Sequence, residues 1–416
     1  MNKYPGEIKL KYWLLYLFLS ITIFIGLFFN EDSSGSGGYI NDFHNTWPIN
    51  DLIRNKIFFN FSEYTIHFPL HYYIIYILDF LFHGKENVKI FFCIISILLP
   101  YLFFRCLEER FNFIDRNNLF LFSQIIFILP AFRSGAIWAN SQITSLIFFL
   151  LSIYFFIKWK NNKINFLNNY IVLQLLFLSL AVYSRQLYAI IFLYILFVYF
   201  LNLKFKEFIK VCVITLFFAI PGFYLVLLSP TTLKTTFDLN FINSSFVNLS
   251  IISFYLLPFY FLMDKKYFIK NLENKNNIKV LFVFFLIIFL FSFFFTYNYT
   301  LGGGFFIKLS ILLFNNLYLF YLTSFAGLLC IFFIYKQSKI DVVLFILLVF
   351  GFSSYQIFQK YFEPMLIILF FLMINSKLQT VFLRNVKKIF FYLSYFLIYL
   401  ITALINDLFK ISKILL

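Results

Sequence analysis

The side chains best suited to chemistry gather in one polar stretch of an otherwise apolar chain, residues 31–69. All four histidines lie in or just after this stretch: His44, His67, His71 and His83. It also holds five of the eighteen acidic residues: Glu31, Asp32, Asp42, Asp51 and Glu63. Carboxylates and imidazoles are the side chains that most often transfer protons or bind metal ions. Chemistry is therefore expected to involve this stretch.

The composition indicates the solvent in which the rest of the chain lies. Hydrophobic residues make up 62% of the 416 residues, and the mean hydropathy is +0.87. So much apolar surface cannot be buried within a water-soluble fold, which predicts an all-α, polytopic integral membrane protein. The formal net charge of +16 is then assigned to cytoplasmic loops. The sequence contains no basic patch interleaved with stacking aromatic residues, so nucleic-acid binding is not expected.

Cysteines and the first residues add two expectations. The four cysteines lie in or beside apolar runs without CxxC spacing, which predicts neither a disulfide framework nor a zinc site: Cys93, Cys106, Cys212 and Cys330. Residues 1–11 carry three lysines and precede an apolar run that reaches Asn30 without an A-x-A-like cleavage site. This pattern predicts a retained signal-anchor helix.

Apolar runs of suitable length predict thirteen membrane spans. They are 12–30, 89–105, 119–132, 137–157, 167–183, 187–203, 209–228, 249–263, 279–297, 309–335, 341–358, 362–375 and 389–406. Residues 70–83 are apolar but short and two-sided, which predicts a helix lying on the membrane surface. With the N-terminus inside, the cytoplasmic segments then carry 23 of the 34 Lys and Arg residues. Residues 31–88 become the first extracytoplasmic loop, within a single membrane-embedded domain, 1–416.

Several ionisable side chains fall at the predicted outer face, where a charge near hydrocarbon costs about 2.5 to 3.5 kcal/mol on insertion scales. They are Asp42, His44, Arg133, Arg185 and Lys360. Arg185 is the most informative, because Tyr183-Ser184-Arg185-Gln186 separates two apolar spans with almost no loop to hydrate it. Its guanidinium either snorkels to the interface or clamps a phosphate or carboxylate through two parallel hydrogen bonds.

Several motifs resemble those of the membrane-embedded glycosyltransferases of the GT-C type, which take a sugar from a polyprenyl phosphate. The resemblance includes their order along the chain and their predicted place at the outer face. The matching segments are Asn41-Asp42-Phe43-His44, Thr65 to Tyr73, Leu129-Pro130 followed by Trp138 to Gln142, and Gln359-Lys360-Tyr361-Phe362-Glu363-Pro364. The last resembles the family's Arg-Tyr-x-x-Pro, with Lys360 in the arginine position. Two departures are Phe68, where a second proline is usual, and the missing acidic residue of the fourth span.

One branch of that family, the dolichyl-phosphate-glucose α-1,2-glucosyltransferases, is similar in a further respect. Its acidic-x-x-His arrangement, its Pro-containing segment and its Arg-Gln pair are loosely similar to Asp42-Phe43-His44, Thr65 to Tyr73 and Arg185-Gln186, although one residue rather than two separates Asp42 from His44. The similarity implies a hexose donor.

The implied chemistry assigns roles to these residues. Asp42 is expected to take the proton of an acceptor hydroxyl that attacks the anomeric carbon opposite the phosphate, which gives inversion. Arg185 and Lys360, with Arg133 as a further candidate, are expected to bind the donor phosphate. The expected lining residues are His67, His71, Tyr72, Gln186 and Tyr361.

Three roles stay open for His44: orienting the acceptor, binding a divalent metal ion with Asp42, or lying at the membrane surface. An Asp-x-His pair is far from a complete ligand set, so no cofactor is assigned beyond that metal ion. Glu363 could neutralise Lys360 locally. The glycine-bearing stretches 33–38 and 302–304 lack the strand-turn-helix context of a nucleotide site.

The expected partners are a polyprenyl-phosphate sugar donor, membrane lipid, and a glycan, glycolipid or protein acceptor. A bacterial inner membrane with the active site on its outer face is the expected location. Two other classes remain open: an outer-leaflet polysaccharide polymerase or ligase, and a transporter of lipid-linked glycans. The first would be expected to carry its largest polar loop late in the chain, and the second to carry charges at mid-membrane.

Overall fold

The computed structural model contains helices and no strands among the residues that it describes, which agrees with the predicted all-α class. These residues are 7–34, 38–55, 68–162, 165–228, 240–262, 273–298, 302–352 and 356–415. The chain divides into two compact units: residues 1–233 together with 393–416, and residues 234–392. The single-domain organisation predicted above therefore stays a prediction.

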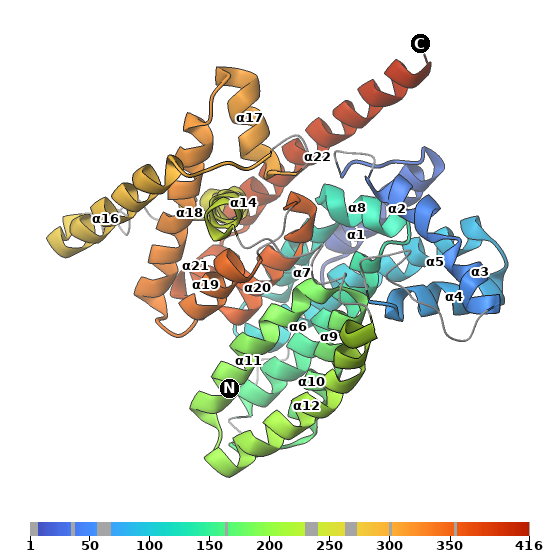
Figure 1. Ribbon diagram of the computed structural model, residues 1–416, viewed down its shortest axis with the longest axis horizontal. Coiled ribbons are helices and arrows are strands. Elements are labelled where there is room, and N and C mark those ends of the chain that lie inside the picture. Colours follow the sequence, from blue (N-terminus) through green and yellow to red (C-terminus); the bar gives the residue numbers. More distant parts are fainter. Residues whose placement is uncertain are drawn as a thin grey trace. The chain divides into compact units, whose positions relative to one another are not determined.

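The first unit contains most of the polar residues discussed above, and its helices can be followed by their labels in Figure 1. Its helices are α1 (Leu10–Phe28), α2 (Gly38–Thr46), α3 (Ile49–Asn55), α4 (Leu70–Phe82), α5 (Lys85–Ser96), α6 (Leu98–Arg110), α7 (Arg116–Ser123), η2 (Gln124–Ile128), α8 (Pro130–Ile137), α9 (Ser141–Asn161), α10 (Asn169–Ser184), η3 (Gln186–Tyr188), α11 (Ala189–Asn202), α12 (Phe205–Leu228) and most of α22 (Val386–Leu415).

The second unit is built from the remaining helices and the first turns of α22. They are α14 (Phe241–Phe261), α16 (Lys275–Ser292), α17 (Gly304–Phe314), α18 (Tyr318–Gln337), α19 (Val342–Gly351), η4 (Gln359–Tyr361), α20 (Met365–Met373) and α21 (Lys377–Leu383).

Helix length and composition are those of an integral membrane protein. Within the described residues, eight helices are long and apolar enough to cross a membrane, and ten if each of two bent helix pairs counts as one span. Five shorter apolar helices of 10 to 17 residues accompany them, among them α4, α10 and α19. The count of thirteen spans stays a prediction.

Local sequence signals explain where several of these helices begin and bend. Asn140, Asn168 and Asn240 each accept a backbone N–H in the first turn of α9, α10 and α14, as N-cap residues do. Pro130 cannot continue the helix that precedes it, and Leu129 before it adopts an extended conformation. The pair Arg116–Ile128 and Pro130–Ile137 is bent by 67° at this point.

The predicted span 309–335 is divided in the structure. α17 ends at Phe314 and α18 begins at Tyr318, because Asn315 adopts the left-handed conformation with φ 50°. Asparagine tolerates this conformation better than most residues, and it ends the helix there.

Small residues hold α14 and α18 together in the second unit. A Cβ atom added to Gly327 of α18 would lie 2.1 Å from the backbone oxygen of Leu249 in α14. The hydroxyl of Ser324 donates to the backbone oxygen of Phe246, and the hydroxyls of Ser250 and Thr323 are 3.2 Å apart. Close backbone approach and hydroxyl contacts of this kind are typical of helices that pack within a membrane.

Candidate functional site

Two groups of polar contacts in the first unit lie at opposite ends of α9. At its start, Gln142 contacts residues of α2 and the end of α10; at its end, Lys158 pairs with Glu109 at the end of α6. We call the first group the polar end, defined by Glu31, Asp32, Arg133, Gln142 and Arg185. The second group is the basic end, defined by Arg105, Glu108, Glu109, Arg116 and Lys158. The candidate residues of the first unit are examined at the polar end.

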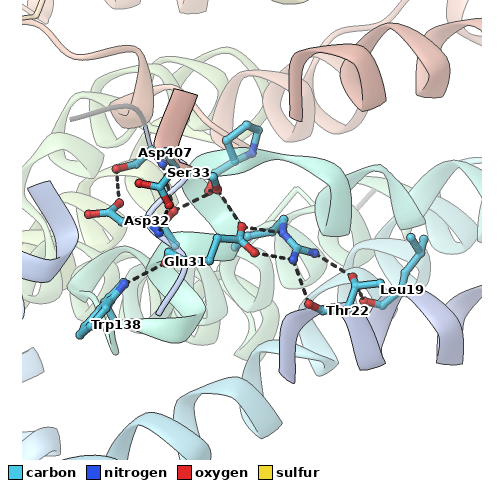
Figure 2. A network of polar contacts seen from close by, with 11 residues as sticks. Leu19, Thr22, Glu31, Asp32, Ser33, Trp138 and Asp407 are labelled. Carbon is cyan, nitrogen blue, oxygen red and sulfur yellow. Dashed lines mark hydrogen bonds and ion pairs between the residues drawn. The ribbon is translucent and has the colours of Figure 1, made fainter. Parts of the chain in front are cut away.

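A buried ion pair forms the centre of the polar end (Figure 2). The Nε and Nη2 atoms of Arg133 donate to the two carboxylate oxygens of Glu31 at 2.9 and 2.7 Å. The Nη1 and Nη2 atoms also donate to the side chain and backbone oxygen of Thr22 in α1. Nε, Nη1 and Nη2 each donate within the protein, so Glu31 and Thr22 hold the guanidinium of Arg133 in place, which indicates a structural role.

Glu31 has further contacts that hold it in place (Figure 2). The hydroxyl of Ser33 donates to its carboxylate at 2.8 Å, and Nε1 of Trp138 donates to its backbone oxygen at 2.9 Å. The side chain is 5% exposed, and that of Arg133 is 6% exposed. A buried pair with this many hydrogen bonds fixes the start of the first loop against α1 and α8.

Asp32 organises the helix that carries Asp42. Its carboxylate accepts the backbone N–H of Tyr39 at 3.0 Å and of Ile40 at 3.2 Å, both in the first turn of α2. A carboxylate in this position satisfies N–H groups that have no partner within the helix and complements the helix dipole. The backbone N–H of Asp32 in turn donates to the carboxylate of Asp407 in α22 (Figure 2).

Tyr39 connects α2 to the two helices that carry Gln142 and Arg185. Its phenolic hydroxyl donates to the side-chain oxygen of Gln142, which also accepts from Nη1 of Arg185 at 3.3 Å. Tyr39 is fully buried, Gln142 is 2% exposed, and Arg185 is 4% exposed. Three segments far apart in sequence therefore meet at the polar end. Gln186 follows Arg185 directly and opens η3.

Asp42 and His44 lie on the exposed side of α2, while Tyr39 and Phe43 form its buried face. Two residues apart on a helix, their side chains point in different directions. The ring of His44 contacts that of Trp138, at 5.8 Å between centroids, and Nζ of Lys89 lies 4.2 Å from the centroid of the same indole. The described residues contain no group of three or more His, Cys, Asp or Glu side chains that could hold a metal ion.

The predicted helix 70–83 is present as α4, Leu70–Phe82. His71 and Tyr72 are buried, and Nδ1 of His71 lies 2.9 Å from the hydroxyl of Thr144 in α9. His71 therefore packs beside the start of α9, because Thr144 lies two residues after Gln142 in that helix. His67 lies outside the described residues.

Lys360 and Tyr361 belong to η4 of the second unit. Both are partly buried, and Nζ of Lys360 lies 5.3 Å from the ring centroid of Phe358. Glu363 is buried and accepts from the hydroxyl of Tyr255 at 2.7 Å. The contacts of η4 thus define a second, separate set of polar residues.

Sequence reasoning missed the most buried polar groups of the polar end. The sequence pattern places Glu31 and Asp32 in a polar stretch and Lys89 at the start of a span. In the structure Lys89 is 2% exposed and contacts Asn30, Glu86 and Trp138. Two adjacent acidic residues directly after an apolar run were the available signal. Acidic side chains at a membrane-helix end require partners, and Arg133 was within the predicted outer set.

Comparisons with protein families, with curated proteins and with solved structures find no match for this chain.

Proposed function

We propose that the chain is a GT-C-type membrane glycosyltransferase that moves a hexose from a polyprenyl-phosphate donor to a glycan, glycolipid or protein acceptor. The observation that carries the proposal is the link from Tyr39 through Gln142 to Arg185. It brings the helix with Asp42 to the same end of the first unit as the arginine proposed to bind phosphate. His71 lies beside this link through its contact with Thr144.

Asp42 is the proposed base. It takes the proton of the acceptor hydroxyl while that oxygen bonds to the anomeric carbon, and the bond from that carbon to the phosphate oxygen breaks, which releases polyprenyl phosphate with inversion. A carboxylate acts as an effective base near neutral pH only when it is desolvated. Since Asp42 is exposed on α2, bound donor and acceptor would have to supply that desolvation.

Arg185 is the proposed phosphate ligand of the first unit. A buried guanidinium stabilises charge that develops on a leaving phosphate more strongly than one in water. Its contact with Gln142 orients Nη1. Within the second unit, Lys360 and its neighbour Tyr361 are further proposed donor contacts, and Arg133 has the structural role of holding Glu31.

The proposed topology keeps the thirteen spans, with residues 31–88 on the outer face of a bacterial inner membrane and α4 on the membrane surface. The outward side of α4 supports its placement. Tyr73, Ile77, Phe80 and Leu81 follow the i, i+4, i+7, i+8 spacing of one helix face and are 39% to 65% exposed. An apolar exposed face of this kind suits contact with lipid.

The test is transfer by the purified full chain in liposomes that contain radiolabelled polyprenyl-phosphate hexose. We expect protein-dependent loss of the label from the donor, by transfer or by hydrolysis. Asp42→Asn is expected to abolish turnover and to retain donor binding, because it removes the proton acceptor and leaves Arg185 in place.

Asp51→Asn is the matched control, since Asp51 is an exposed carboxylate on the neighbouring helix α3. Its turnover should equal that of the unmodified chain. Full activity of Asp42→Asn would exclude Asp42 as the base. No consumption of donor, together with movement of labelled lipid-linked glycan across the vesicle membrane, would favour a transporter instead.

A further inference from the structure

The second unit contains an apolar cavity of about 690 Å³ between α14, α16, α18 and α19. Its lining is mostly aromatic and branched aliphatic, and includes Phe284, Ile288, Leu328 and Ile346. Only Asn277 and Ile288 of α16 are buried, so this helix covers the cavity without packing closely on its neighbours. The cavity is open on one side, and an apolar surface of this size that is not covered by the chain marks a site for an apolar partner.

Polar groups line the cavity mainly at one end, where α16 begins and α18 ends. Asn276 and Asn277 lie in the first turn of α16, and Lys336 lies in the last turn of α18. Among the described residues close to this end, Lys275 and Lys279 are exposed on α16, and Glu273 is the exposed glutamate that accompanies them.

The nearby carboxylate of Asp341 is buried and accepts the backbone N–H of Asn375. The charge available at the cavity entrance is therefore mainly positive. An apolar cavity with a cationic entrance complements a molecule with a hydrocarbon tail and an anionic head.

We infer that this cavity binds an acyl chain of an anionic phospholipid, with the lipid phosphate at Lys336. The predicted topology places residues 264–279 and 336–341 on the cytoplasmic side, where anionic lipids attract juxtamembrane lysines. The inference is independent of the proposed transferase activity, which is assigned to the other face and to other residues.

The test is native mass spectrometry of the full chain in detergent with added dioleoyl phosphatidylglycerol, or with dioleoyl phosphatidylcholine of the same chains. We expect one tightly retained phosphatidylglycerol per chain. Leu328→Trp should weaken its retention by placing a larger side chain in the cavity, whereas Leu322→Trp should not, because Leu322 lies on the same helix with 63% exposure and outside the lining.

Lys336→Gln should weaken phosphatidylglycerol binding about fivefold and leave phosphatidylcholine binding unchanged. Lys387→Gln, an exposed lysine outside the cavity, is the control and should have no effect. The melting temperature in lipid-free detergent checks that Leu328→Trp remains folded, and Ile346→Trp provides a second cavity-filling variant.

Unchanged retention in both folded tryptophan variants would overturn the inference. Equal binding of the two lipids, unaffected by Lys336→Gln, would overturn the anionic assignment. Dimers that retain no lipid would show that a second copy of the chain covers the cavity instead.

Discussion

The ion pairs at the two ends of the first unit differ in how far their side chains are exposed to solvent. At the polar end, Glu31 and Arg133 form a pair with side chains 5% and 6% exposed. At the basic end, Lys158 and Glu109 are 31% and 25% exposed, and Arg105 pairs with Glu108 at 43% and 18% exposure. Both ends contain ion pairs, but only one of them removes the charges from water.

This difference separates two functions of charge in one bundle. Partly hydrated pairs contribute little to stability, and lysine and arginine at such positions mark the cytoplasmic side of membrane proteins. A buried pair fixes geometry, because losing one partner leaves the other charge without compensation. On the proposed topology the basic end lies on the cytoplasmic side, whereas the polar end fixes the helices that carry or adjoin Asp42 and Arg185.

The largest expected effect concerns the side of the membrane on which each end lies. Cysteines are introduced at His44 or at Asn162, both exposed, in a Cys212→Ser background, because the other three native cysteines are buried. On intact cells, a membrane-impermeant maleimide should label the first fully and the second only after lysis. The reverse pattern would invert the assignment of the two ends.

Breaking the buried pair should have the next largest effect. Arg133→Met should lower the free energy of unfolding by about 3 to 5 kcal/mol, because it leaves the Glu31 carboxylate buried without its partner. Unfolding in mixed detergent micelles measures the change. The double variant Glu31→Leu, Arg133→Met should recover most of the loss; no recovery would show that the loss arises from something other than the uncompensated charge.

A smaller and local effect is expected at the start of α2. Asp32→Ala should destabilise this helix by about 1 to 2 kcal/mol, because the N–H groups of Tyr39 and Ile40 lose their acceptor. Hydrogen exchange of the α2 amides should accelerate accordingly. Asp51→Ala on α3 should leave α2 exchange unchanged, and equal acceleration in both variants would contradict a specific capping role.

The smallest effect is expected at the basic end. Glu109→Gln should change the free energy of unfolding by less than about 1 kcal/mol, since its pair with Lys158 is partly hydrated. Unfolding of this variant and of Arg133→Met is compared under identical conditions. If Glu109→Gln lowered the free energy of unfolding as much as Arg133→Met, the two ends would not differ in the contribution of their ion pairs to stability.

Much of the helical framework could be predicted from the sequence. α4 was predicted within one residue of its end, because Pro69 and Gly84 bound its apolar run, and Gly84 adopts φ 109°. α9 was displaced by four residues at each end, since hydropathy alone ignores the N-cap formed by Asn140. The break at Asn315 was missed because polar residues within an apolar run do not reveal backbone conformation.

The candidate site was less accessible to sequence reasoning. The partners of Arg133 and His71 lie 102 and 73 residues away, and one sequence gives no means of pairing them. The exposure of Asp42 could have been inferred, since Tyr39 and Phe43 at i and i+4 mark the opposite, buried face of α2. Charge counting located the polar residues, but only the folded chain identifies which of them contact one another.

The hydrogen bond from Asp32 to Asp407 joins residues 375 positions apart. During synthesis at 5 to 20 residues per second, Asp407 emerges on the order of 20 to 80 s after Asp32. For that interval α1 is already made, while the loop before α2 lacks one of its anchors. The contact between the residues before α2 and α22 therefore forms only after residue 407 has been made, which makes it one of the later contacts of this region to form.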